Sequence, residues 1–254
     1  STRSSTTLAR ATPRRIPTGI SSRPNDAGRR AVNSAKLSSE AMHVDLTAIR
    51  TDYARAGFSE RDLDPSPMKQ LEKWVDEAVV AQHPEPTAMT LATVTAAGDP
   101  AARIVLLKGL DTRGLVFYTG YESDKGQQLA KSPRACACFF WVLLEWQARV
   151  SGSVVKVDRA ESEAYFASRA RASQLGAWAS DQSREMLQRH DLERRVAEVA
   201  ARFEGTSVPR PPYWSGFRVV PDRIEFWHSK PGRLHERTVY QRDGDGWRVT
   251  SLYP

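Results

Sequence analysis

The spacing of apolar residues along this chain changes from a helical period to an alternating one near residue 88. Residues 68–78 carry apolar side chains at intervals of three and four, which predicts an amphipathic helix. Asp64-Pro65-Ser66-Pro67 predicts where that helix begins. A shorter amphipathic helix is predicted over residues 46–53. The first folded part of the chain is therefore expected to be helical.

From residue 88 onward, apolar and polar residues alternate in short runs separated by Gly, Asp and Pro. This pattern predicts strands over residues 88–95, 103–108, 115–119, 135–141, 147–157, 217–220, 223–227, 233–242 and 247–252. Helices are predicted over residues 124–131, 161–166 and 181–203. Because the first three strands follow one another through tight turns, the sheet is expected to be antiparallel. We predict a mainly β (α+β) domain, a Greek-key-like antiparallel barrel with flanking helices.

The first 43 residues do not share this patterning. They hold eight Lys or Arg and two Asp or Glu, a net charge of +6 out of the total of +7. Rich in Ser, Thr, Arg and Pro, they predict a disordered basic extension ahead of a single domain over residues 44–254. Two other interpretations stay open: a segment upstream of a natural start at Met42, or an organelle transit peptide. The high pI therefore says little about the partners of the domain.

Several functional classes are not expected. No run of 18 apolar residues occurs, which argues against a membrane span, and the tail lacks the interleaved aromatic residues of a nucleic-acid arm. Five scattered His and no paired Cys motif leave no zinc signature, so no metal site is predicted. Cys136 and Cys138 would face the same side of a strand and are interpreted as small apolar residues in a reducing, cytoplasmic compartment.

One segment, Tyr165 to Trp178, concentrates groups that bind phosphate. It carries two arginines, two serines and a glutamine among apolar residues. Arginine offers a planar fork to phosphate oxygens, and hydroxyl groups complete such a shell. A solvated helix face is the alternative for this segment taken alone.

Other polar groups recur at the ends of the predicted strands. Arg103 and Lys108 bracket an apolar run, and because they are five residues apart a regular strand would point them to opposite faces. Curvature or a bulge would bring them to one site; otherwise they serve two ligands or are edge charges. Arg233, His235 and Arg237 alternate along a predicted strand and so share a face, which suits an anionic ligand or an exposed barrel face.

No Ser-His-Asp order, no Cys nucleophile and no inward carboxylate pair stands out. The polar residues instead suit anions and a flat ring, which indicates that a bound cofactor supplies redox chemistry.

The combination of Ser-Arg-x-Arg-x-Ser-Gln-Leu-Gly-Ala-Trp over residues 168–178 with Arg-Leu-His-Glu-Arg over residues 233–237 resembles the pyridoxine/pyridoxamine 5′-phosphate oxidase family. The resemblance runs in order from about residue 46 to residue 254. It implies an FMN-binding split β-barrel that forms a homodimer through a C-terminal dimerisation region, with FMN at the subunit interface. It implies oxidation of pyridoxine or pyridoxamine 5′-phosphate to pyridoxal 5′-phosphate, with O2 reoxidising FMN and H2O2 released.

The resemblance also implies roles for individual residues. The catalytic residues would be Arg233 and His235. The substrate would contact Arg50, Tyr53, Lys108, Tyr165, Arg169, Ser173, Arg233, Leu234 and His235. FMN would contact Arg103, Ile104, Val105, Leu106, Leu107, Lys108, Tyr118, Thr119, Lys125, Gln147, Gln182, Ser183, Trp227 and Arg237. Arg50 and Tyr53 would belong to an N-terminal lid over the substrate.

Five residues depart from the family pattern. Asp124, Trp146 and Ser251 stand where the family usually has Arg, Ala170 replaces Pro, and Ser215 replaces Gly. Two alternative functions therefore stay open. The first is a related flavin oxidase acting on another ring, such as a phenazine intermediate. The second is a non-catalytic protein that binds FMN or pyridoxal phosphate.

Overall fold

The computed structural model describes residues 63–188 and 190–254, which lie within one compact unit, Arg50–Pro254. The predictions for residues 1–43, for the helix over residues 46–53 and for the lid residues Arg50 and Tyr53 fall outside the described residues.

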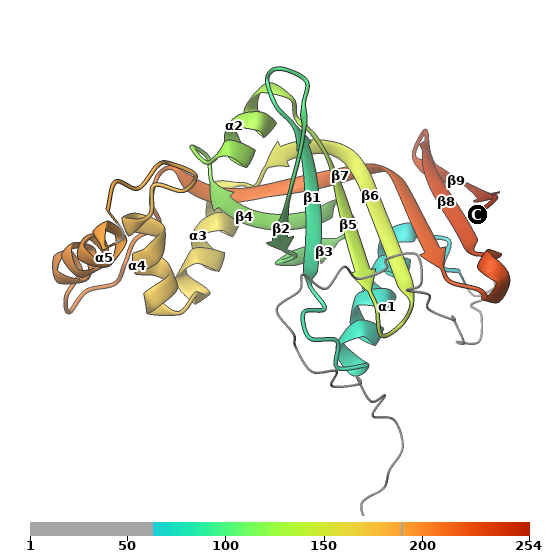
Figure 1. Ribbon diagram of the computed structural model, residues 1–254, viewed down its shortest axis with the longest axis horizontal. Coiled ribbons are helices and arrows are strands. Elements are labelled where there is room, and N and C mark those ends of the chain that lie inside the picture. The colour runs from blue at the N-terminus through green and yellow to red at the C-terminus, as the bar shows by residue number, and fades with distance from the viewer. Residues whose placement is uncertain (1–62, 189) are drawn as a thin grey trace, which may run out of the picture. The chain divides into compact units, whose positions relative to one another are not determined.

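The described chain forms one sheet with helices beside it (Figure 1). Its elements in chain order are α1 Pro67–Val80, β1 Ala88–Val94, β2 Pro100–Leu106, β3 Gly109–Asp111, β4 Gly114–Gly120, α2 Asp124–Lys131, β5 Arg134–Trp141, β6 Trp146–Lys156, α3 Arg159–Ser168, α4 Arg171–Ala179, α5 Asp191–Arg202, β7 Trp214–His228, a 3₁₀ turn Pro231–Arg233, β8 Glu236–Asp243 and β9 Gly246–Leu252.

All strand pairs of the sheet are antiparallel, in the order β2-β1-β5-β6-β7-β4-β3, and β8 pairs with β7 and β9. The chain passes from β2, at one end of this order, into β3, at the other end. The Lys108 amide between these two strands donates to the Val116 carbonyl of β4 at 2.8 Å. The two ends of the sheet therefore meet. The predicted antiparallel split barrel with flanking helices is confirmed.

Helix α1 packs its apolar side against this barrel. Pro67 occupies its first turn, where a missing N–H costs nothing, and the Ser66 side chain accepts from the Lys69 amide. Trp74 is buried and stacks on Trp146, with ring centroids 4.5 Å apart. Trp146 is one of the departures from the family pattern. Its ring is buried against Trp74, which explains why an apolar aromatic side chain fits at this position.

The longest strand, β7, has 15 residues and pairs with β4, β6 and β8. The sequence predicts two separate strands over residues 217–220 and 223–227, but the register shift between Ser151 and Gly152 lets β7 continue past Pro221. A Cβ at Gly152 would lie 1.9 Å from the Val220 carbonyl oxygen, so only glycine fits at this irregularity.

The predicted helix over residues 181–203 is wrong in its first half, because α5 begins only at Asp191. The carboxylate of Asp181 accepts from Arg195 at 2.5 and 2.9 Å, which ties Asp181 to the side of α5. Ser183 has a φ of 71°, outside the helical region.

The predicted strand over residues 233–242 is also too long, since β8 begins at Glu236. Over residues 63–254, Arg189 excepted, no helix combines the length and apolar character needed to cross a bilayer. The same residues contain no group of three or more His, Cys, Asp or Glu placed to hold a metal ion.

Candidate active site

A cavity of about 320 Å³ lies where the two ends of the sheet meet. It is lined by Ile104, Val105, Leu106, Lys108, Tyr118, Thr119, Lys125, Tyr165, Arg169, Gln182 and Trp214. All of these except Trp214 are residues that the sequence predicted for cofactor or substrate. We call it the main cavity.

Three polar side chains at one wall of the main cavity bond to one another. The Thr119 hydroxyl donates to the Gln182 side-chain oxygen at 2.9 Å, and the Lys125 ammonium donates to the Thr119 hydroxyl at 3.3 Å. The Gly120 amide also donates to the Gln182 oxygen, at 3.2 Å. The segment after α4 is thereby held against β4. Gln182 reaches the site from a turn, not from the helix N-terminus that the sequence predicted.

Lys125 is a buried cation in the first turn of α2, after the N-cap Ser123. Burial lowers the pKa of the Lys125 ammonium, and the positive charge of Arg103 lowers it further, while Asp124 acts in the opposite direction. No carboxylate among the described residues forms an ion pair with Lys125. Two neighbouring cations without a paired anion suit a phosphate group.

Arg103 does not line the main cavity. Its guanidinium donates to the hydroxyl of Thr93, to the side-chain oxygen of Gln128 at 3.0 Å, and to the carbonyls of Leu91 and Ala101 at 3.3 Å each. Leu107 is buried in the core, whereas Lys108 follows the end of β2 and lines the cavity. The strand ends at Leu106, so the alternation that would point Arg103 and Lys108 to opposite faces does not extend to Lys108.

Aromatic rings stack along another wall. The rings of Tyr118 and Tyr165 are 3.9 Å apart at 16°, and those of Tyr118 and Trp214 are 5.3 Å apart at 11°. Burial raises the pKa of Tyr118 to about 12 and raises the pKa of Tyr165 as well. Both phenols therefore stay protonated near neutral pH and can donate hydrogen bonds.

Arg169 stands over this stack, with its guanidinium carbon 4.7 Å from the ring centre of Trp214. Burial lowers the pKa of the Arg169 guanidinium. Its NH1 atom is buried and has no hydrogen-bond partner among the described residues. A buried donor without a partner is costly, which indicates that a ligand acceptor belongs there.

Arg169, Gln182 and Trp214 also line an adjoining cavity of about 320 Å³. Ser173, predicted with Tyr165 and Arg169 for the substrate phosphate, lies in the first turn of α4 and lines this second cavity. Ser183 is exposed and lines neither of the two. The residues predicted to bind the substrate phosphate thus lie around Arg169, which lines both of these adjoining cavities.

The remaining predicted residues lie on β6, β7 and β8. Gln147, Trp227 and Arg237 form a cross-strand row, because Gln147 pairs with Trp227 and Trp227 pairs with Arg237. The rings of Trp227 and His235 are 4.7 Å apart, and His235 and Arg237 line a hollow of about 150 Å³. We call Gln147, Trp227, His235 and Arg237, with the turn before β8, the C-terminal group.

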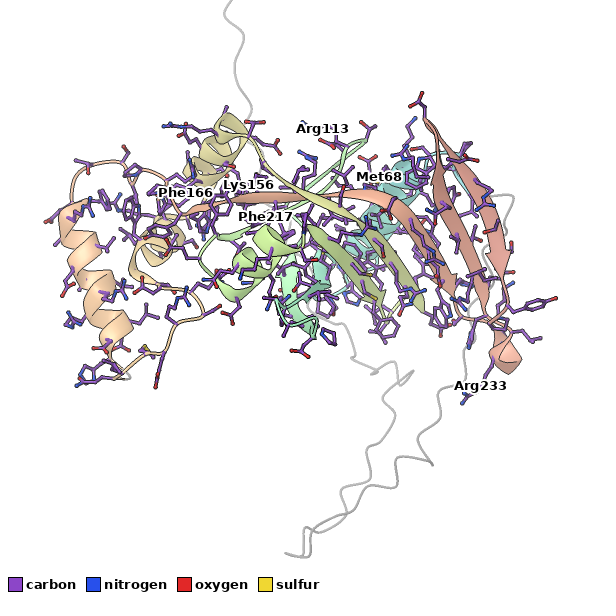
Figure 2. All side chains as sticks on the ribbon, turned by 90° about the horizontal axis from the view of Figure 1, so that it is seen from above. Met68, Arg113, Lys156, Phe166, Phe217 and Arg233 are labelled. Atoms are coloured by element: carbon purple, nitrogen blue, oxygen red, sulfur yellow. The ribbon has the colours of Figure 1, made fainter. Side chains whose placement is uncertain are left out.

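The turn before β8 corrects the prediction that Arg233, His235 and Arg237 alternate along one strand. Arg233 ends the 3₁₀ turn with a φ of 62°, and Leu234 is 72% exposed. Only Arg237 belongs to β8. The side chain of Arg233 reaches solvent beyond the end of the sheet (Figure 2).

The main cavity and the C-terminal group do not meet within the described part of one chain. Phe166 of α3 and Arg233 lie toward opposite ends of the long axis of this unit (Figure 2). Strand β7 runs from Trp214 at the main cavity to Trp227 and His228 at the C-terminal group (Figure 1). Fifteen residues of extended strand span up to roughly 45 Å.

Sequence reasoning missed Trp214 and Ser123. Trp214 follows a Pro-rich segment, so an aromatic residue entering a strand there was the available signal. Ser123 is buried, donates to the Gly120 carbonyl at 2.7 Å and caps α2, which places Lys125. A serine one residue before a predicted helix is an N-cap signal.

Two family models match the chain. "Pyridoxamine 5′-phosphate oxidase" matches residues 75–203, and "Pyridoxine 5′-phosphate oxidase C-terminal dimerisation region" matches residues 214–254. A pyridoxine/pyridoxamine 5′-phosphate oxidase from Rubrobacter xylanophilus is 51% identical over 215 residues, covering 85% of this chain and 99% of the relative. Pyridoxine/pyridoxamine 5′-phosphate oxidase 1 from Ralstonia nicotianae is 54% identical over 210 residues, covering 82% and 99%.

Solved structures give the same fold. PhzG from Burkholderia lata 383, determined in complex with tetrahydrophenazine-1-carboxylic acid, superimposes with a TM-score of 0.74 at 34% identity, covering 78% of this chain and 98% of that one. A pyridoxamine 5′-phosphate oxidase-related, FMN-binding protein from Nostoc punctiforme gives a TM-score of 0.61 at 18% identity, covering 76% and 100%, and so supports the fold alone. With half of its length matched by the family model and relatives above 50% identity, the chain belongs to the pyridoxamine 5′-phosphate oxidase family.

Proposed function

We propose that this chain is an FMN-dependent oxidase that converts pyridoxine 5′-phosphate and pyridoxamine 5′-phosphate to pyridoxal 5′-phosphate in vitamin B6 metabolism. Molecular oxygen is the final acceptor, H2O2 is released, and the amine substrate also yields NH3. The observation that carries this proposal is the buried, unpartnered NH1 of Arg169 beside the Tyr118–Tyr165–Trp214 stack. A phosphate beside an aromatic wall is what a phosphorylated pyridine requires.

FMN, when bound, supplies the acceptor for the hydride that leaves the substrate. Lys125, Thr119 and Gln182 form the hydrogen-bonded wall that would hold the cofactor phosphate, and the strand Ile104 to Leu106 would contact its ring and ribityl chain. Lys108, Tyr165, Arg169 and Ser173 would hold the substrate phosphate. The protein's part is to bind, orient and exclude water, so no strong general base is needed.

A complete site requires a second copy of the chain. The C-terminal group lies at the far end of β7 from the main cavity, and all of it except Gln147 belongs to the region matched by the dimerisation model. Ile104 is 64% exposed and Phe140 is 56% exposed, so apolar side chains are available to a partner surface. We propose a homodimer in which Arg233 and His235 of one copy orient the substrate in the main cavity of the other.

A flavin oxidase acting on a phenazine intermediate is the second candidate, favoured by the similarity to PhzG. The unpartnered NH1 of Arg169 argues against it, because a ring without phosphate would leave that donor unsatisfied. A non-catalytic protein that binds FMN or pyridoxal phosphate is the third. We propose a cytoplasmic location for any of these, in line with the interpretation of Cys136 and Cys138 as small apolar residues.

The test is to purify the full chain, record its visible spectrum, and follow pyridoxal phosphate formation from both phosphorylated vitamers under air. A yellow protein that forms product, and that fails to oxidise unphosphorylated pyridoxine at the same concentration, is the expected result. A yellow protein without product would favour the binding role, and oxidation of a phenazine precursor alone would favour the second candidate. A colourless protein that takes up no added FMN would contradict the proposal.

A further inference from the structure

Glu225 is a buried carboxylate on β7 that the resemblance does not assign to any role. Its side chain is 1% exposed and lies on the same face of the sheet as Trp227, two residues further along the strand. Buried carboxylates need partners, because an unpaired charge away from water is strongly unfavourable.

Three arginines supply those partners. Arg149 stands directly opposite Glu225 on β6 and donates to its Oε2 atom. Arg223 donates to the same oxygen at 3.1 Å. Arg237, from β8, donates from Nε to Oε1 at 2.9 Å, and its NH2 lies 2.9 Å from that oxygen. Together these contacts lower the pKa of Glu225 despite the opposing effect of its burial.

The contacts of Arg237 fix its guanidinium on two sides. Two nitrogens face Glu225, and the third donates to the Tyr253 carbonyl at 3.1 Å. Trp227 is its cross-strand neighbour, and both belong to the C-terminal group. An arginine held in one orientation before binding loses less conformational freedom when an anion arrives.

The charges of this cluster do not cancel. Among the described residues, Glu225 is the only carboxylate that pairs with Arg149, Arg223 or Arg237, which leaves a net charge of +2. The Nε of Arg149 is also buried and has no hydrogen-bond partner in the part of the chain that the structure describes. The cluster is therefore both oriented and able to accept an anion.

We propose that Glu225 is a positioning residue for cofactor binding: it holds Arg237 in the orientation in which that arginine contacts FMN. This inference rests on the proposed function and on the FMN contact that the family resemblance implies for Arg237. Glu225 itself touches no ligand and acts through the guanidinium that it holds.

The sign of the effect of Glu225→Gln separates positioning from a purely electrostatic role. Removing the negative charge raises the net charge of the cluster from +2 to +3, so an electrostatic role alone predicts tighter binding of FMN, which is an anion. Loss of the orienting contact predicts weaker binding, by about 10-fold, the lower end of the effect of removing a partner that orients a metal-ligating side chain.

The measurement is the dissociation constant of FMN for the full-length apoprotein, from quenching of flavin fluorescence, together with the thermal midpoint of each apoprotein. Asp222→Asn is the matched control, since Asp222 lies on the same strand, is partly exposed and pairs with Arg134 at 2.6 Å. We expect Glu225→Gln to weaken FMN binding about 10-fold and Asp222→Asn to change it by less than about 2-fold.

A double-mutant cycle with Arg237→Ala tests whether Glu225 acts through that arginine. We expect Glu225→Gln to add less than about 2-fold to the loss caused by Arg237→Ala alone, because the two act as one unit. A purely structural role would give equal losses in both backgrounds and would overturn the inference. Unchanged or tighter binding by Glu225→Gln in the wild-type background would overturn it too.

If the Glu225→Gln apoprotein does not fold, Glu225→Asp takes its place in the same cycle. The shorter carboxylate keeps the charge but lies further from Arg237. We therefore expect a smaller loss of FMN affinity, seen only in protein that retains Arg237. No loss of FMN affinity would contradict the inference. Wild-type protein that binds no FMN would refute the proposed function and this inference with it. Normal FMN binding by wild type with no effect of Glu225→Gln would refute this inference alone.

Discussion

Arg169 and Arg171 are two residues apart and carry the same guanidinium, yet their surroundings differ. Arg169 faces the main cavity with an unpartnered NH1, whereas Arg171 donates to the carbonyls of Phe203 and Thr206 at 2.6 and 2.8 Å. Gln174 donates to the carbonyls of Phe166 and Ala167 at the end of α3. Arg171 and Gln174 therefore cap backbone carbonyls at the C-terminal ends of α5 and α3. The sequence pattern did not reveal this role.

Replacing Arg169 by Lys should raise the KM for pyridoxine 5′-phosphate by about 10-fold or more. Lysine keeps the charge but loses the planar fork and its place over Trp214, which removes a charge-assisted hydrogen bond of about 1.5–3 kcal/mol. Steady-state kinetics across substrate concentrations measure this. Arg171→Lys is the control: it should lower the free energy of unfolding by about 1 kcal/mol and leave KM unchanged. An equal rise in KM for both variants would contradict the assignment.

Ser215 shows how one departure from the family pattern is accommodated. Its hydroxyl donates to the Ser162 hydroxyl at 2.6 Å, and both side chains are buried. The bond joins β7 to α3, the helix that carries Tyr165. The buried hydroxyl that replaces the family's glycine therefore has a hydrogen-bond partner, and the bond fixes β7 to a helix of the main cavity.

The backbone of Arg233 lies in the left-handed region, with a φ of 62°. That conformation costs a non-glycine residue about 1 kcal/mol. We expect Arg233→Gly to raise the free energy of unfolding by about that amount and Arg233→Ala to leave it nearly unchanged. Both should reduce turnover far more than FMN binding, measured by chemical denaturation, oxidase assay and flavin fluorescence. Equal loss of turnover and FMN affinity in Arg233→Ala would show that the proposed role is wrong.

At the scale of elements, the alternating pattern located several strands of the sheet well. Residues 88–95, 135–141 and 147–157 coincide within a residue or two with β1, β5 and β6. The errors arose where tertiary contacts override local patterning. Asp181 pairs with Arg195 of α5 instead of opening the helix, and Pro231 with Gly232 forms a turn where alternation suggested a strand.

Two glycines should respond oppositely to alanine. Gly152 faces the Val220 carbonyl oxygen, 1.9 Å from where a Cβ would stand, so Gly152→Ala should destabilise the fold by about 3 kcal/mol. Gly176 lies inside α4, and no atom outside its own helix lies within 4 Å of where its Cβ would stand, so Gly176→Ala should stabilise the fold by about 0.5–1 kcal/mol. Urea denaturation of each variant provides the comparison, and a stabilised Gly152→Ala would refute the close approach.

At the scale of the whole molecule, the predicted site residues divide into two sets that one chain keeps apart. Sequence motifs identify residues by type and order, so they placed Arg169 and Arg233 in one site without revealing that Arg169 lines the main cavity, whereas Arg233 ends the turn before β8. The length of β7 and the position of the β8 turn determine that separation, and neither is encoded in a short motif.

Mixing two inactive variants tests whether the site is shared between copies. Arg169→Ala disables the main cavity and Arg233→Ala disables the C-terminal group, so each homodimer should be inactive. If the chains are unfolded together and refolded, half of the dimers are hybrids with one intact site, and about a quarter of wild-type activity should return. Refolding each variant alone is the control. No recovery in the mixture, with both variants folded and dimeric, would mean that one chain forms the whole site.

The continuity of β7 has a consequence for how this sequence can vary in length. Trp214 and Trp227 stand on one uninterrupted strand, so their separation is a fixed number of peptide units. Inserting or deleting one residue between them would turn every later side chain to the opposite face of the sheet. Trp214 at the main cavity and Trp227 in the cross-strand row with Arg237 would then no longer keep their relative orientation, although both tryptophans were still present. Apart from the register shift that Gly152 already permits, insertions and deletions are therefore expected in the turns. The length of β7 sets the spacing between the main cavity and the C-terminal group.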